Sequence, residues 1–187
     1  PYTPSAYSWP STFTKEQEEY LTSEIQRLLT LLGMRTSIYN VETRVGTNGR
    51  PYIMEVSPRG GGNRLAEMIR FATGVDLITN AVRAAVGEEV SEVEQRPYKG
   101  YWAEVVLHAD TDGHFIALDI DEEFYHAHVR QTDLWVKQGD RVSAFRGAND
   151  AIGTLVLEFK NDKEMLTKLK SQKEWLKIRL NNNLKIR

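Results

Sequence analysis

The sequence predicts an α+β protein in which an antiparallel sheet with flanking helices is followed by a smaller, β-rich α+β part. Three features of its 187 residues support this prediction. Apolar residues recur at helical spacing in the first third of the chain, a hairpin signal separates two β-rich runs, and short β-rich runs dominate after residue 98. The polar segment SEVEQRP indicates a boundary, so we expect a first domain of residues 1 to 95 and a second of residues 96 to 187.

The composition excludes several classes of protein. With 24 Lys and Arg against 26 Asp and Glu, and 41% hydrophobic residues, the chain is typical of a globular protein rather than a disordered, collagenous or coiled-coil one. No apolar run is long enough to span a bilayer, and the first residues lack a signal-peptide pattern. Because cysteine is absent, any metal must be bound by oxygen or histidine, and we expect a cytoplasmic protein that does not contact membranes.

The first predicted element is an amphipathic helix. Thr14 followed by Gln17 is a capping-box pattern, and Gly33 provides a stop. Between them, apolar residues recur at i, i+4, i+7, i+8 and i+11, namely Leu21, Ile25, Leu28, Leu29 and Leu32. This spacing predicts one apolar helix face.

A β-hairpin comes next. Residues 36 to 45 and 51 to 57 are typical of strands, and the Asn48-Gly49 dipeptide between them is a strong hairpin signal. A two-residue loop there would make Glu42 face Glu55 across the ladder. Alternation then predicts a buried face made of Tyr39, Val41, Thr43, Val45, Tyr52, Met54 and Val56. The opposite, polar face would carry Asn40, Glu42, Arg44, Glu55 and Ser57.

The facing glutamates pose an electrostatic problem with two solutions. Like charges directly across a ladder are destabilising unless something compensates them. A divalent cation such as Mg²⁺ could do so, since Mg²⁺ is held by one or two carboxylates together with substrate phosphates. Alternatively, Arg44 and another basic residue could neutralise the pair on a solvated face. The hairpin alone leaves both interpretations open.

A glycine-rich loop follows the hairpin and precedes two helices. Arg59, Gly60, Gly61 and Gly62 lead into a helix beginning near Asn63 and closed by a glycine at position 74, and Asp76 caps a second helix that ends at Gly87. Glycines expose backbone N–H groups, and arginine grips anions with a planar fork. Such a loop is commonly only a flexible connection, but its place beside two carboxylates favours a phosphate site.

The second domain is predicted to be richer in strands. We expect strands over residues 101 to 109, 114 to 118, about 124 to 136, and 151 to 159. Strand geometry would place His126 and His128 on one face, where a packing or surface role is favoured over metal binding.

The end of the chain is basic. Residues 160 to 187 hold nine Lys and Arg residues against three Asp and Glu. Helically spaced leucines lie among them, at Leu166, Leu169, Leu176 and Leu180. We therefore expect the solvated side of a packed helix, and no nucleic acid as a partner.

Two motifs carry a resemblance to a known family. NVETRV and PYIMEVSPRGGGN resemble the carboxyl-terminal half of the ATP-grasp superfamily, and the likeness runs from about residue 40 to 87. The resemblance implies that Glu42 and Glu55 are metal ligands, and that Ser57, where the family usually has Asn, is a third, weaker oxygen ligand of the metal. The EVSPR stretch of this sequence is also similar to one in the formate-dependent glycinamide ribonucleotide transformylase branch of the superfamily. Arg59 matches the arginine that contacts the transferred phosphoryl group, and the backbone of residues 60 to 63 would bind phosphate or substrate.

The resemblance also implies an activity. The chain would be a fragment of an ATP-dependent ligase that uses ATP with Mg²⁺ (or Mn²⁺) to activate a carboxylate as an acyl phosphate for attack by an amine. The family's N-terminal ATP-grasp half, which supplies the adenine pocket, has no counterpart before residue 36, and the chain begins at Pro1 inside a connection-like stretch. We therefore expect this fragment alone to be inactive. Its expected partners are small-molecule carboxylate and amine substrates, the missing N-terminal half, and a second copy of the protein in a homodimer.

Two other readings stay open. The chain could belong to a relative of carbamoyl phosphate synthetase, biotin carboxylase or the formate-dependent purine transformylase. It could also be a non-catalytic nucleotide-binding module of the same fold.

Overall fold

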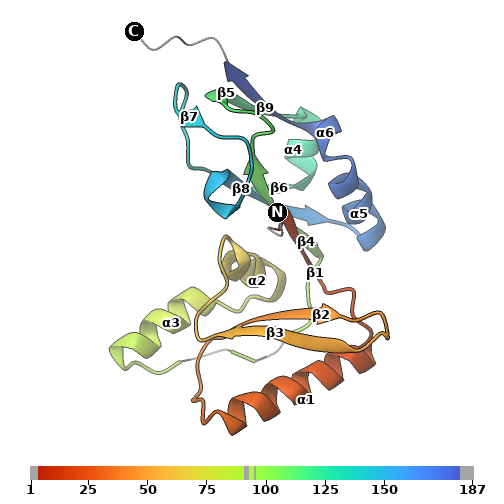
Figure 1. Cartoon of the computed structure of the whole chain (residues 1–187), viewed down its shortest axis with the longest axis vertical. Helices are drawn as coiled ribbons and strands as arrows, with labels where there is room; N and C mark the ends of the chain where they lie inside the picture. Colours follow the sequence, from red (N-terminus) through yellow and green to blue (C-terminus); the bar gives the residue numbers. More distant parts are fainter. Residues whose placement is uncertain (1–3, 91–92, 95, 182–187) are drawn as a thin grey trace. The chain divides into compact units, whose positions relative to one another are not determined.

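The computed structural model describes residues 4–90, 93–94 and 96–181, which form two compact units (Figure 1). The first, here called the hairpin unit, comprises Ser11–Arg70 and Gly74–Arg96. The second, the sheet unit, comprises Pro1–Pro10, Phe71–Thr73 and Pro97–Arg187. The polar boundary segment predicted at residues 91 to 97 lies partly outside the described residues.

The hairpin unit contains three helices and a two-stranded sheet among its described residues. They are α1 (Lys15–Leu31), β2 (Asn40–Val45), β3 (Pro51–Ser57), α2 (Leu65–Thr73, whose last three residues join the sheet unit) and α3 (Leu77–Val86). The predicted helix starts are confirmed: Thr14 forms the capping box with Gln17, and Asp76 caps α3. Gly74 and Gly87 end α2 and α3 in the left-handed conformation, at φ 80° and 78°.

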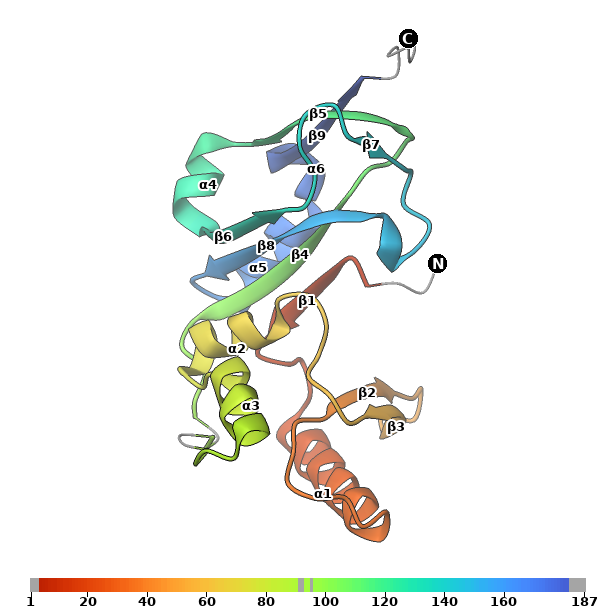
Figure 2. The same cartoon turned by 90° about the vertical axis from the view of Figure 1, so that its left-hand side faces the viewer.

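Helix α1 lies along the hairpin and contacts its tip (Figure 1, Figure 2). The Gln17 amide donates to the Gly49 carbonyl oxygen at 2.7 Å, and Arg50 Nε donates to the Tyr20 hydroxyl at 2.9 Å. The Arg50 guanidinium also lies over the Tyr20 ring, 4.8 Å from its centroid. The hairpin is therefore anchored at the end opposite the candidate site.

The hairpin register is confirmed in one half and corrected in the other. Asn40 pairs with Ser57, and Glu42 pairs with Glu55, as the sequence predicts. Beyond Glu42 the register shifts by one, because Met54 is an extra residue in β3. The predicted two-residue turn is wrong: Gly46 N–H donates to the Arg50 carbonyl oxygen at 2.9 Å, which closes a wider loop.

This bulge also overturns part of the predicted buried face. An extra residue reverses the alternation of the side chains that precede it in β3. Met54 is 62% exposed and Tyr52 45% exposed, and Val45, at the turn, is 42% exposed. Ile53 and Pro51 take the inner positions instead, half-buried and buried respectively.

The sheet unit is built from antiparallel strands. One sheet has the order β1-β4-β8-β6, and the other β7-β5-β9. The strands are β1 (Ala6–Trp9), β4 (Tyr101–His108), β5 (Gly113–Ile120), β6 (Val129–Leu134), β7 (Arg141–Val142), β8 (Ala151–Phe159) and β9 (Leu176–Asn181). Helices α4 (Glu122–His128), α5 (Asp162–Lys170) and α6 (Gln172–Trp175) pack with them, together with a 3₁₀ turn at Ala148–Asp150. The core lies between the sheets and these helices, with Leu107, Leu155 and Leu157 fully buried.

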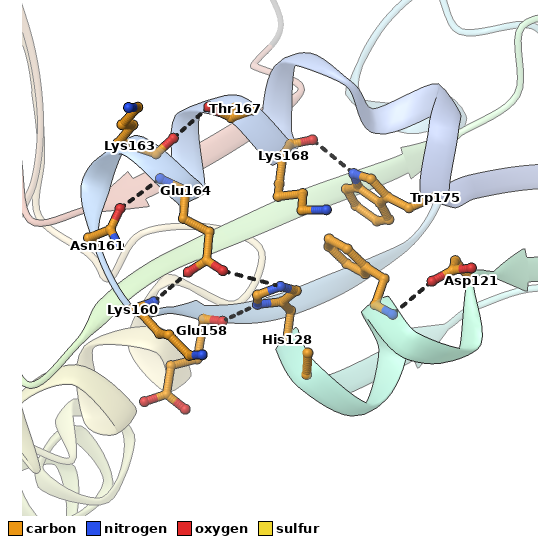
Figure 3. A network of polar contacts seen from close by, with 12 residues as sticks. Asp121, His128, Glu158, Lys160, Asn161, Lys163, Glu164, Thr167, Lys168 and Trp175 are labelled. Carbon is orange, nitrogen blue, oxygen red and sulfur yellow. Dashed lines mark hydrogen bonds and ion pairs between the residues drawn. The ribbon is translucent and has the colours of Figure 1, made fainter.

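The strand predicted over residues 124 to 136 is wrong in its first part. Asp121 accepts a hydrogen bond from the Phe124 N–H at 2.9 Å and starts helix α4, so the strand begins only at Val129. On a helix, His126 and His128 point in different directions. His126 is exposed, whereas His128 is buried, donates from Nδ1 to the Glu158 carbonyl oxygen at 3.0 Å and has Nε2 3.8 Å from Glu164 Oε1 (Figure 3). The packing role predicted for His128 is therefore confirmed.

The single basic helix predicted at the end of the chain is also wrong. Its start forms α5, but Leu176 and Leu180 lie in strand β9. Trp175 ends the helical part, and its ring stacks on that of Phe124 with 3.9 Å between the ring centroids. The Trp175 indole N–H donates to the Lys168 carbonyl oxygen at 2.8 Å (Figure 3). From Leu176 onward the side chains alternate between half-buried apolar and exposed basic, which is the strand period.

None of the helices in the described residues has the length and apolar character needed to cross a bilayer.

Candidate metal and phosphate site

Four side chains of the hairpin form the centre of the candidate site, and we call them the quartet. Asn40 and Glu42 come from β2, and they face Ser57 and Glu55 of β3 in a regular stretch of the ladder. Directly paired residues of an antiparallel ladder point to the same side of the sheet, so the four polar groups share one face. The bulge at Met54 begins just beyond this stretch and leaves it intact.

The two carboxylates of the quartet, Glu42 and Glu55, are exposed. Neither Glu42 nor Glu55 forms an ion pair with any described residue, Arg44 included, although Arg44 lies on the same strand as Glu42. The Ser57 hydroxyl donates to Glu55 Oε1 at 2.7 Å. Two acidic side chains about 5 Å apart at Cβ make a strong local negative potential, to which a divalent cation is well matched.

The donor set limits which metal chemistry the site can support. Among the residues that the structure describes, no group of three or more His, Cys, Asp or Glu side chains could hold a metal ion. The carboxylate pair therefore needs further oxygens from amide, hydroxyl or phosphate groups. All of these are hard oxygen ligands, which suit Mg²⁺ and Mn²⁺.

The loop that follows β3 brings Arg59 next to the glycines. The Arg59 N–H donates to the Ser57 carbonyl oxygen at 2.8 Å, and its Nη1 donates to the Gly60 carbonyl oxygen at 2.8 Å. At Gly60 and Gly62 an added β-carbon would meet no atom within 4 Å, so space is open beside both. Asn63 takes the left-handed conformation at φ 54° and turns the chain into α2.

Gly61 is the tight position of this loop. A β-carbon there would lie 2.7 Å from Leu65 Cδ1 and 3.3 Å from Asn40 Oδ1. The glycine loop therefore passes directly over the amide of Asn40 at the start of β2. This contact ties the loop to the quartet within the hairpin unit.

The start of helix α2 differs from that of α3. Asp76 caps α3 by accepting from the Thr79 N–H at 2.9 Å, and this bond lowers the pKa of Asp76 below its ordinary value, so the cap is anionic at neutral pH. At α2 the N-cap residue, Arg64, makes no such side-chain bond and instead pairs with Glu67 at 2.6 Å. The side chain of Arg64 thus gives the start of α2 no capping hydrogen bond, in contrast to that of Asp76 at α3.

The residues that the sequence singles out lie together in the hairpin unit. Glu42, Glu55 and Ser57 share one hairpin face, and residues 59 to 63 form the loop that leaves it. Asn40 appears in the sequence only as a polar-face residue. In the structure, Asn40 lies opposite Ser57 and next to Gly61, and this position makes its amide a further candidate for the site.

Comparison with known proteins gives relatives that extend beyond this chain. No family model matches it. The uncharacterized protein y4rH of Sinorhizobium fredii is 31% identical over 150 residues, which is 80% of this chain and 31% of that protein. Carnosine synthase 1 from Homo sapiens is 33% identical over 86 residues, 46% of this chain and 10% of that enzyme. The chain thus spans about a third or less of the relatives it matches.

Solved structures share the fold at lower identity. The L-amino acid ligase of Bacillus licheniformis superposes with a TM-score of 0.82 at 19% identity, over 97% of this chain and 45% of the ligase. Phosphoribosylglycinamide synthetase of Anaerococcus prevotii gives a TM-score of 0.78 at 18% identity, over 96% of this chain and 46% of that chain. The biotin carboxylase domain of Hydrogenobacter thermophilus 2-oxoglutarate carboxylase, solved with MgADP and bicarbonate, gives 0.70 at 19% identity, over 94% of this chain and 39% of that domain. These proteins are ATP-grasp ligases.

Proposed function

We propose that this chain, which has the fold of the carboxyl-terminal half of an ATP-grasp ligase, supplies the metal- and phosphate-binding half of such an enzyme's active site. One observation carries the proposal. Glu42 and Glu55 are paired across the ladder, and no described Lys or Arg side chain forms an ion pair with either carboxylate. The glycine loop that begins with Arg59 lies next to them. Carboxylates, arginine and exposed backbone N–H groups are the set that handles Mg²⁺ and a polyphosphate together.

Glu42 and Glu55 would hold the metal ions. Their carboxylates stand on paired strands, so the backbone that carries them is already ordered before a cation binds. The Ser57 hydroxyl, which donates to Glu55 Oε1, orients that carboxylate. When bound, Mg²⁺ or Mn²⁺ would neutralise charge on the nucleotide phosphates and polarise them.

Arg59 and the loop would act on the phosphoryl group. In phosphoryl transfer the protein contributes mainly position and electrostatic stabilisation, and little proton chemistry is needed. The Arg59 guanidinium has donors beyond the one used on Gly60, and the open space at Gly60 and Gly62 lets backbone N–H groups approach an anion. These groups would stabilise the charge that passes from ATP to the acceptor carboxylate.

The substrates would be a small carboxylate, activated as an acyl phosphate, and an amine that attacks it. An L-amino acid ligase and a carnosine synthase are among the proteins that resemble this chain, which favours amino acids as the carboxylate and amine. A biotin carboxylase-like, carbamoyl phosphate synthetase-like or formate-dependent transformylase activity is the second candidate, supported by the bicarbonate-bound biotin carboxylase neighbour. Because both glutamates and Arg59 are present, we place a non-catalytic nucleotide-binding module behind either activity.

An N-terminal ATP-grasp half would complete the site. The chain covers 45% of the Bacillus ligase, and the adenine pocket would come from the remainder of an enzyme of that size. We further propose a cytoplasmic enzyme, and a homodimer as its assembly; the 2-oxoglutarate carboxylase neighbour is described as a dimer.

The isolated 187-residue chain is expected to hydrolyse no ATP above background and to bind Mg²⁺-ATP poorly, because half a cleft cannot enclose a nucleotide. A polypeptide that also carries an N-terminal ATP-grasp half should release phosphate only when a carboxylate and an amine are both supplied. Phosphate release across a panel of amino acids, bicarbonate and formate tests the reaction class. Robust turnover by the isolated chain would contradict the assignment of a half-site, and release independent of every carboxylate would contradict the ligase reaction.

Replacing Glu55 with Gln is expected to weaken binding of Mg²⁺-ATP in the polypeptide with both halves by about tenfold or more. The amide keeps the shape of the side chain and can still accept from Ser57, but it removes a negative charge that faces the metal. The measurement is the Mg²⁺ dependence of phosphate release, which should move to higher Mg²⁺. Glu89→Gln, in the segment after α3, is the matched control and should leave this dependence unchanged. An unaltered Mg²⁺ dependence in Glu55→Gln would remove this residue from the metal site.

A further inference from the structure

We propose that Asn40, in place of Ser57, supplies the third protein oxygen to the divalent cation held by Glu42 and Glu55. The inference rests on the proposed function, since it concerns the same metal site, and it assigns a ligand that neither the motif nor the relatives indicate. Three observations on the quartet carry it.

The first observation is the register. Asn40 lies directly opposite Ser57, two residues before Glu42, so its side chain belongs to the same face as both carboxylates. Each of the four corners of this face carries an oxygen. Either Asn40 or Ser57 is therefore placed to add an oxygen to the glutamate pair.

The second observation is what the Ser57 hydroxyl already does. Its proton is donated to Glu55 Oε1 at 2.7 Å, so the hydroxyl is held back along its own strand against the carboxylate. A serine oxygen is also separated from its Cβ by a single bond, whereas an amide oxygen is carried one atom farther out. The Asn40 amide carbonyl is the stronger dipole and the kind of neutral oxygen that hard divalent cations accept.

The third observation is the position of Asn40 relative to the glycine loop. Its Oδ1 would lie 3.3 Å from a β-carbon at Gly61, so the amide shares a face with the carboxylates and also lies against the loop proposed to bind phosphate. A cation that joins carboxylates to phosphates would bind near both groups. Asn40 is also half-buried, so ordering its side chain loses less entropy than ordering an exposed one.

Binding of Mn²⁺ alone to the 187-residue chain, followed by electron paramagnetic resonance, tests the proposal without requiring turnover. Asn40→Ala is expected to raise the Kd for Mn²⁺ by on the order of tenfold, and Ser57→Ala by less than about threefold. Asn40→Asp, which keeps an oxygen at the same position and adds a charge, should bind Mn²⁺ at least as tightly as the unaltered chain. The double variant Asn40→Ala with Ser57→Asn should recover most of the lost affinity, because it moves the amide to the facing corner.

Far-UV circular dichroism of each variant checks that the hairpin still forms, and Asn40→Asp decides the matter if Asn40→Ala is misfolded. A Ser57→Ala effect equal to or larger than that of Asn40→Ala, or an Asn40→Asp chain that loses Mn²⁺, would overturn the proposal. The double variant Glu42→Gln with Glu55→Gln distinguishes a wrong metal site from a wrong role for Asn40. If it leaves Mn²⁺ binding intact, the metal site itself is wrong; if it abolishes binding while Asn40→Ala does not, only the role of Asn40 is wrong.

Discussion

Replacing Arg59 with Lys is expected to lower kcat by on the order of 10²-fold while the enzyme still binds nucleotide, in a polypeptide that carries both ATP-grasp halves. Lysine keeps the positive charge but has no planar fork, so it cannot hold its own loop and grip a phosphoryl group at once. In the structure, Arg59 Nη1 already donates to the Gly60 carbonyl oxygen, and this bond fixes the direction of the guanidinium. The loss matches the removal of one preorganised donor to a transition state.

Steady-state kinetics with the preferred carboxylate and amine would measure kcat and KM separately. Arg27→Lys is the matched control, because Arg27 lies on α1 in an exposed ion pair with Glu24 and should tolerate the same exchange. A near-unchanged kcat in Arg59→Lys would remove the phosphoryl-transfer role from this residue. A rise in KM for ATP with unchanged kcat would place Arg59 in ground-state nucleotide binding instead.

The hairpin unit could be predicted in most of its elements because its signals are local. The capping box at Thr14 and the glycine stops each depend on a few neighbouring residues, and they determine where helices begin and end. The pairing of Glu42 with Glu55 was also predicted. This pairing is correct although the turn is wider than predicted, because the extra loop residue and the bulge at Met54 compensate each other before the quartet is reached.

The local sequence pattern does not predict the bulge in β3. Met54 is apolar and sits at an alternating position, so pattern alone places it in the core. Its exposure depends on the wider turn, in which Gly46 bonds Arg50. The hairpin tip also contacts α1, where Gln17 bonds Gly49 and Arg50 bonds Tyr20. These contacts join residues far apart in the sequence, so no local pattern predicts them.

Two elements of the sheet unit are predicted wrongly because their local patterns fit both a helix and a strand. At the first of them, the N-cap residue Asp121 favours helix α4 over the predicted strand. At the end of the chain, leucines spaced for a helix also fit a strand, and the alternation of Leu176, Lys177 and Ile178 was the better guide. Within the site, the possible role of Asn40 could not be seen from spacing, since it needs both the register and the path of the glycine loop.

Replacing Gly153 with Ala is expected to destabilise the sheet unit by about 3 kcal/mol, the largest stability effect of a single methyl group that the structure indicates. Gly153 is buried in β8 between Leu107 of β4 and Leu134 of β6, and a β-carbon there would overlap the Asp133 carbonyl oxygen and lie 3.1 Å from Leu134 Cα. Backbone atoms in the middle of a sheet cannot move aside as a flexible side chain can, so strand β6 would have to separate from β8.

Urea unfolding followed by tryptophan fluorescence measures this effect selectively, because all four tryptophans lie in the segments of the sheet unit. Gly147→Ala is the matched control: its backbone is extended, at φ −175°, and an added β-carbon would meet no atom within 4 Å. It should change stability by no more than about 0.5 kcal/mol. Equal unfolding midpoints for Gly153→Ala and the unaltered chain would mean that β6 and β8 do not approach each other at this residue. The order of the four-stranded sheet would then need revision, whereas the hairpin unit and its candidate site would be unaffected.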